Sequence, residues 1–148
     1  MGENRSLPFE PLRVSRLVFF NKPYGVLSQF TLEGKWRALD EFIPVKDVYV
    51  AGRLDADSEG LLILTDDGKL QAKIADPKHK LEKTYWAQVE GVPDEVTLDR
   101  LRAGIRLSDF TAQPAKVRLI EEPPSLWQRD PPIRFRAAIP TSWLEIRI

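Results

Sequence analysis

A series of short segments rich in β-branched and aromatic residues, separated by turns that contain proline or glycine, constrains the fold of this chain most. Only two segments with helical spacing lie among them, so strands and helices do not alternate regularly. This pattern predicts an α+β fold with a mostly antiparallel mixed sheet and flanking helices. The expected strands are residues 17–20, 26–30, 48–54, 61–65, 83–91, 116–121, 134–139 and 143–148.

Capping residues and apolar spacing predict the two helices. Asp66 or Asp67 can cap the first, which ends before Pro77. The second begins in residues 93–95 and ends near Gly104. Their apolar faces are formed by Leu70 and Ile74 in the first, and by Leu98, Leu101 and Ile105 in the second.

Turn residues and strand alternation give further expectations. Residues 21–25 predict a hairpin or a sharp corner between the first two strands. Tyr85, Ala87 and Val89 should share one face of their strand. In the last strand, the side chains expected to point inward are Leu144, Ile146 and Ile148.

Composition excludes several kinds of chemistry. The chain has no cysteine, so a disulfide framework, a thiolate metal site and a cysteine nucleophile are impossible, and the composition fits a reducing compartment. Its one histidine, His79, excludes a two-histidine metal site and is expected in a solvated loop. The 22 basic and 22 acidic residues lack the basic excess typical of nucleic-acid binders. Because no apolar stretch approaches the ~18 residues of a membrane span, we expect a cytoplasmic protein that does not enter a membrane.

Residues 52–68, GRLDADSEGLLILTDDG, concentrate carboxylates between two expected strands. In an extended chain, the spacing of two places Arg53 and Asp55 on the same side of the strand end. The guanidinium could then hold the carboxylate in one orientation, as a nucleophile or general base requires. A purely structural ion pair at the end of a strand explains the same spacing.

Two other readings of this segment are open. Asp55, Asp57, Glu59 and Gly60 match the first positions of an EF-hand calcium loop, but its last ligand would be Asp66 instead of a glutamate, and the flanking segments are β-rich. A hydrolase could instead use Asp55 and Glu59 as a carboxylate pair. No further residue pattern supports that pair.

Three motifs, in order and at characteristic spacing, resemble those of the RsuA/RluE-type pseudouridine synthases. They are FNKPYGVLS at 20–28, GRLDADSEGLLILTDDG at 52–68 and KTYWAQVEG at 83–91. The resemblance extends from about Leu17 to Ile148. The stretches WQRDPPIRFR and PTSWLEI look most like the large-subunit rRNA branch E of this family.

The resemblance implies roles for individual residues. Asp55 falls on the essential catalytic aspartate, and Arg53 on the arginine that pairs with it. Tyr85 matches the tyrosine whose ring packs against the target base, and Lys83 fills the first position of the same Lys-x-Tyr motif. The Lys22-Pro23 turn corresponds to a first motif that shapes the fold beneath the site.

The implied reaction isomerises a specific uridine of large-subunit (23S) rRNA to pseudouridine. This isomerase chemistry needs no redox cofactor, nucleotide or metal, so we expect no cofactor, rRNA as the partner and a monomer. A proline-framed loop should supply RNA contacts through Trp127, Arg129, Arg134 and Arg136, although a solvated hairpin is equally compatible with it. The alternative function is a non-catalytic RNA-binding or ribosome-assembly fragment of the same fold.

The resemblance also predicts the domain organisation. Residues 1–16 form an N-terminal tail too short for the S4 RNA-binding domain of many relatives, and residues 17–148 form the catalytic domain. The family continues beyond this point into an arginine-rich loop and helix. We therefore expect a catalytic domain without its C-terminal part.

Overall fold

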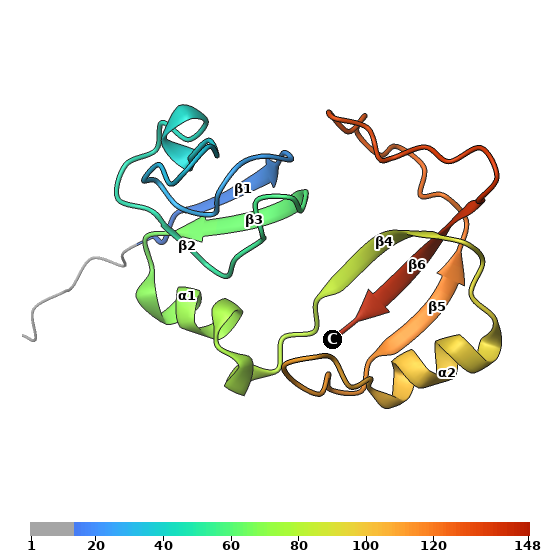
Figure 1. The fold of residues 1–148 in the computed structure, drawn as a ribbon. Helices are drawn as coiled ribbons and strands as arrows, with labels where there is room; N and C mark the ends of the chain where they lie inside the picture. Colours follow the sequence, from blue (N-terminus) through green and yellow to red (C-terminus); the bar gives the residue numbers. More distant parts are fainter. Residues whose placement is uncertain (1–13) are drawn as a thin grey trace, which may run out of the picture. The chain divides into compact units, whose positions relative to one another are not determined.

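The computed structural model describes residues 14–148 (Figure 1). Most of the expected N-terminal tail, residues 1–13, lies outside the described residues. The chain divides into two compact units, Met1–His79 and Lys80–Ile148. The described strands form one three-stranded antiparallel sheet in each unit, which confirms the α+β class.

The sheet of the first unit has the strand order β1-β3-β2. β1 (Leu17–Lys22) pairs along its whole length with β3 (Gly60–Thr65), and β2 (Tyr49–Val50) pairs with the end of β3. Leu62 and Leu64 of β3 pack in the same core as Leu39 of a 3-10 helix at Leu39–Glu41. The buried core consists of Val26, Leu39, Ile43, Val48, Leu62 and Leu64.

One strand predicted in this unit is absent, and another is shorter than predicted. Residues 26–30 form no strand, because β1 pairs with β3, and Val26 makes only an isolated bridge to Arg37. Main-chain groups here bond to residues 37–39 instead, as in Leu27 N–H to the Arg37 carbonyl (2.9 Å). The strand expected at 48–54 shortens to β2, since the chain turns at Gly52 with φ +100°.

The first predicted helix is confirmed as α1 (Gly68–Ala75). Asp67 caps it, because its Oδ1 accepts hydrogen bonds from the main-chain N–H groups of Lys69 (2.9 Å) and Leu70 (3.1 Å). Bonds from Ser15 and these N–H groups lower the Asp67 pKa. A single 3-10 turn at Pro77–His79 follows, and His79 is exposed, as its solvated-loop prediction requires.

The second unit contains β4 (Thr84–Glu90), α2 (Glu95–Ala103), β5 (Lys116–Ile120) and β6 (Thr141–Arg147). β6 lies between β4 and β5, and α2 lies along β5 (Figure 1). The register places Tyr85, Ala87 and Val89 on one face of β4, as predicted. The buried core is formed by Leu98, Val117 and Leu144.

Three details of this unit differ from expectation. Residues 134–139 are not a strand, because prolines bracket the segment and no neighbouring strand pairs with it. Ile105 lies beyond α2, which ends at Ala103. Ile148 pairs through its main chain with Lys83, but its side chain is 60% exposed instead of buried. No helix within residues 14–148 is long and apolar enough to span a bilayer.

Gly104→Ala is expected to lower the free energy of unfolding by about 1–3 kcal/mol. Gly104 ends α2 with φ +90°, and a Cβ there would overlap the carbonyl oxygen of Ala112. Urea unfolding measures the loss. Gly68→Ala is the matched control, since a Cβ on Gly68 meets no atom within 4 Å and alanine favours the helix. Equal effects of the two substitutions would contradict this account of Gly104.

Glu145 should make the second unit acid-sensitive. It is 8% exposed, and a two-bonded Arg118 fork (2.9 and 3.0 Å) lowers its pKa from 4.5 to about 2. Because the native pKa lies below the unfolded value, this stabilisation is complete above pH 4.5 and is lost as the pH falls toward 2. Unfolding measured from pH 6 to pH 2, in steps of about one unit, should therefore show a shallower acid loss for Glu145→Gln than for the unmodified chain.

Candidate active site

The loop between β2 and β3 presents a row of charged side chains to solvent. Arg53, Asp55, Asp57 and Glu59 are exposed, and each residue between them is half-buried. The loop therefore offers three carboxylates and one guanidinium to a ligand, with Asp55 at the position that the motif predicts for the catalytic residue.

Hydrogen bonds fix the main chain on both sides of Asp55. Before it, Leu54 N–H donates to Ser28 Oγ (3.0 Å), and the same hydroxyl donates to the Leu54 carbonyl (2.7 Å). After it, the Ala56 carbonyl accepts from Gly25 N–H (2.7 Å). Asp55 thus carries an exposed side chain on an anchored backbone, an arrangement suited to a group that must meet a substrate in one geometry.

Lys22, at the end of β1, is completely buried. Its Nζ donates to the carbonyls of Val26 (2.7 Å) and Pro23 (3.2 Å), and so closes the turn that reaches Ala56. Burial lowers the pKa of Lys22, and the nearby carboxylates of Asp57, Glu59 and Asp55 oppose that shift. A buried cation thus lies beneath the carboxylate loop, where the sequence predicted only a fold-shaping turn.

Arg53 does not make its predicted contact. Among the ion pairs of residues 14–148, none joins Arg53 to Asp55. The Arg53 Nη2 instead donates to Gln29 Oε1 at 3.5 Å. The Arg53 side chain is exposed and contacts Gln29. The neighbouring Ser28 forms the hydrogen bonds to the main chain of Leu54. Gln29 and Ser28 were not predicted as part of the site, because their only signal in the sequence is polarity within a short apolar stretch.

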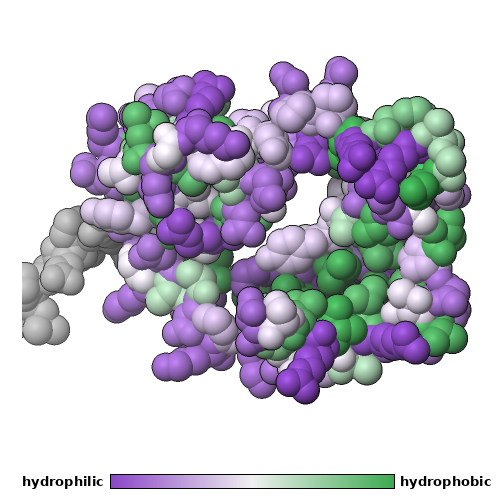
Figure 2. Space-filling view, in the orientation of Figure 1, coloured by the Kyte–Doolittle hydropathy of each residue, from purple (hydrophilic) through white to green (hydrophobic). Residues whose placement is uncertain are grey.

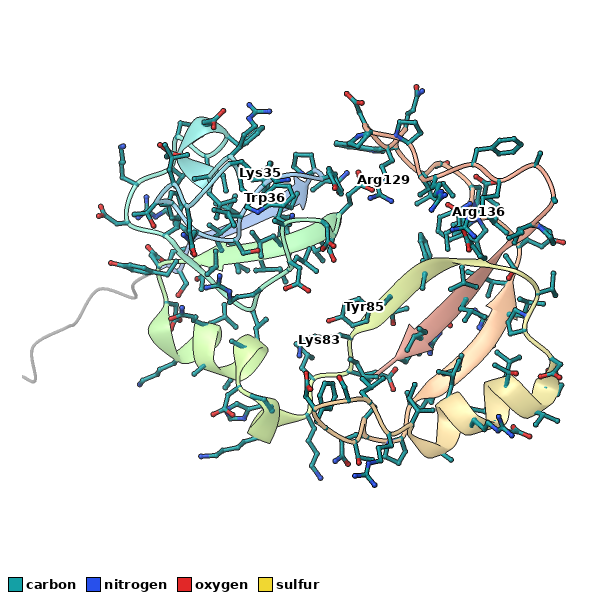
Figure 3. All side chains as sticks on the ribbon, in the orientation of Figure 1. Lys35, Trp36, Lys83, Tyr85, Arg129 and Arg136 are labelled. Atoms are coloured by element: carbon teal, nitrogen blue, oxygen red, sulfur yellow. The ribbon has the colours of Figure 1, made fainter. Side chains whose placement is uncertain are left out.

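Lys83 and Tyr85 lie together at the start of β4 in the second unit (Figure 3). Tyr85 is 37% exposed and lies on β4, an edge strand, where it pairs with Ile146 of β6. The main chain of Lys83 exchanges hydrogen bonds with Ile148 (2.7 and 3.0 Å), and its Nζ donates to the Leu81 carbonyl (3.4 Å). Tyr85 thus lies on a regular strand and is partly exposed to solvent.

The segment between β5 and β6 exposes aromatic and apolar side chains, some of which are visible in Figure 2. Trp127 is 74% exposed, and Arg134 is exposed as well. Arg129 is half-buried, and Arg136 forms an ion pair with Glu90 (3.1 Å). Phe135, between Arg134 and Arg136, is 88% exposed, and no role was predicted for it from the sequence.

A second aromatic group lies beside the Gly25 turn in the first unit (Figure 3). The rings of Tyr24 and Trp36 meet edge to face with centroids 6.2 Å apart, and Lys35 Nζ lies 4.9 Å from the Trp36 centroid. None of these three residues was predicted as part of the site. They place an aromatic surface with a cation next to the turn that anchors Ala56.

The calcium reading gains no support from the geometry. Within residues 14–148, no group of three or more histidine, cysteine or acidic side chains is arranged to hold a metal ion. The carboxylates of the Asp55 loop alternate along an open, exposed segment and do not converge on a common point.

Comparison with known proteins shows which family the chain belongs to. The family description "RNA pseudouridylate synthase" matches residues 16–136. The chain belongs to the RNA pseudouridylate synthase family. The chain is 58% identical over 133 residues to a Vibrio vulnificus protein named ribosomal large subunit pseudouridine synthase E, and the match covers 90% of the chain and 56% of the relative. The predicted RsuA/RluE-type resemblance is confirmed.

Other relatives agree. A Xanthomonas axonopodis protein of the same name is 54% identical, with 89% of the chain and 70% of the relative covered. A solved structure titled "Crystal structure of pseudouridylate synthase" shares the fold with a TM-score of 0.68 at 24% identity, covering 93% of this chain and 52% of the other. The chain spans about half the length of its Vibrio relatives.

Proposed function

We propose that the protein isomerises a specific uridine of large-subunit (23S) rRNA to pseudouridine, with Asp55 as the catalytic residue. The observation that carries this proposal is the position of Asp55: an exposed carboxylate in the family motif, on a main chain hydrogen-bonded on both sides. The names of the Vibrio and Xanthomonas relatives support large-subunit rRNA as the substrate.

The reaction breaks the bond between the ribose C1′ and N1 of uracil, rotates the base, and forms a bond between C1′ and C5. A proton leaves C5 and N1 gains one, so the product has the atoms of the substrate. Asp55 could act as a nucleophile at the sugar or the base, or as a base at the sugar. Its exposed side chain is accessible for each of these routes.

Tyr85, Lys83 and Arg53 are proposed to bind the substrate. A uridine must leave its stack before it can react, and an aromatic face such as that of Tyr85 offsets about 1–3 kcal/mol of lost stacking. Arg53 would exchange its long contact with Gln29 for the substrate or for Asp55. Lys83 supplies a cation beside the Tyr85 strand.

Trp127, Arg129, Arg134 and Arg136 are proposed to contact RNA outside the target nucleotide. Exposed aromatic rings stack on unpaired bases, and arginines bind phosphates. Arg136 would have to leave Glu90 to do so. Binding through these cations should weaken as salt rises, since phosphate contacts release counterions.

The test is to incubate deproteinised large-subunit rRNA with the full chain and to map pseudouridine at single-nucleotide resolution. One new site, absent without protein, is the expected result. Salt-sensitive binding without product, unchanged in Asp55→Asn, would identify the non-catalytic RNA-binding alternative. The monomeric state and cytoplasmic location stay predictions, and size-exclusion chromatography checks the first.

A further inference from the structure

The Ser28 hydroxyl binds both polar main-chain groups of one residue, Leu54, which lies 26 positions away in the chain. Ser28 is 1% exposed. Its single O–H donates to the Leu54 carbonyl at 2.7 Å, and one of its lone pairs accepts the Leu54 N–H at 3.0 Å. Both distances are those of well-formed hydrogen bonds.

These two bonds determine the orientation of the peptide units around Leu54. The Leu54 carbonyl belongs to the planar peptide unit that continues into the nitrogen and Cα of Asp55. Fixing it therefore fixes the direction from which the Asp55 side chain starts. On the far side, the Gly25 N–H bond to the Ala56 carbonyl (2.7 Å) holds the next peptide unit but one. The remaining freedom of Asp55 lies mainly in its own side-chain torsions.

We propose that Ser28 is a positioning residue for Asp55, acting through the main chain of Leu54 and not through contact with substrate. This inference rests on the proposed function, in which Asp55 is catalytic. Without the hydroxyl, the Leu54 carbonyl and N–H lose their partners in a partly buried place, and the segment shifts to regain water. A displacement of about 1 Å at a reacting group costs up to about 100-fold in rate.

The first unit contains a matched control. Thr65 is also 1% exposed, and its Oγ1 likewise donates to one main-chain carbonyl (Arg16, 2.7 Å) and accepts one main-chain N–H (Asp67, 3.1 Å). It lies at the opposite end of β3 from the Asp55 loop. Thr65→Val therefore removes a buried hydroxyl with the same bonding pattern from the same unit, without touching Leu54.

The experiment compares the full chain with Ser28→Ala, Ser28→Thr and Thr65→Val. Three quantities are measured: urea stability, hydrogen exchange of the Leu54 amide by NMR, and kcat and KM on large-subunit rRNA. We expect similar losses of stability for Ser28→Ala and Thr65→Val. Only Ser28→Ala should speed Leu54 exchange, by about tenfold or more, and lower kcat about 10- to 100-fold with KM within about threefold. Ser28→Thr keeps the hydroxyl, so its Leu54 exchange rate and its kcat should both be close to those of the unmodified chain.

The outcomes separate the possible failures. If Thr65→Val lowers kcat as much as Ser28→Ala does, or if Leu54 exchange is unchanged in Ser28→Ala, the positioning role is wrong. If the unmodified chain forms no pseudouridine, the proposed function fails, whereas the Leu54 exchange comparison still decides whether Ser28 holds this segment. Should Ser28→Ala not fold, Ser28→Cys in reducing buffer fills the space with a larger thiol, which weakens both hydrogen bonds, and it provides the same comparison.

Discussion

Asp55→Asn is expected to lower the rate of pseudouridine formation by at least about 1,000-fold. The amide has the shape of the carboxylate but lacks the charged oxygen needed by a nucleophile or a base. The main-chain bonds of Leu54 and Ala56 do not involve the Asp55 side chain, so they should persist. Single-turnover rates at the modified nucleotide, with enzyme in excess over rRNA, measure the chemical step.

Asp57→Asn provides the control for this result. Asp57 is exposed in the same loop, lies near the same buried Lys22, and undergoes the same change of charge. Its rate should stay within about threefold of the unmodified chain, because it carries no proposed bond-making role. If both substitutions reduce the rate equally, the charge of the loop is what matters, and the assignment of catalysis to Asp55 is incorrect.

Local patterns were sufficient where a segment carried both its periodicity and its boundaries. β3 lies where its β-branched and apolar residues predicted a strand, β4 where alternation predicted one, and α1 where the Asp67 cap predicted a helix. The strand prediction for residues 26–30 was wrong. β1 pairs with β3, and this pairing depends on apolar packing that no local feature of the turn indicates. The strand prediction for residues 134–139 was also wrong. A strand needs a neighbouring strand to pair with, and the flanking prolines lack the main-chain N–H that would donate hydrogen bonds.

The candidate site divides in the same way. Asp55 could be selected because an ordered set of motifs surrounds it in the sequence. The buried states of Lys22 and Ser28 could not, since burial of a polar group depends on partners supplied by distant main chain. The Arg53 interaction was mispredicted for a related reason: spacing allowed a pair with Asp55, but Gln29, 24 positions away, offers the contact that the structure shows.

Lys22→Met is expected to lower the free energy of unfolding by about 2–4 kcal/mol. Methionine keeps most of the apolar stem, but the Val26 and Pro23 carbonyls lose their donor. The carboxylates of the Asp55 loop also lose the cation beneath them. Urea unfolding measures the loss, and the exposed Lys46, changed to methionine in the same unit, should alter stability by less than about 0.5 kcal/mol.

The stability difference between the unmodified chain and Lys22→Met should also grow with pH. Burial lowers the native pKa of Lys22 below its usual 10.5, so between these values the unfolded chain binds more protons than the native chain. Stability therefore rises with pH through that window, as the penalty for a buried charge is removed. Lys22→Met lacks this titrating group but keeps all the others. Their contributions to the pH dependence therefore cancel when the two free energies of unfolding are subtracted. A difference that stays constant or narrows up to pH 10.5 would contradict the lowered pKa and the electrostatic role assigned to this buried lysine.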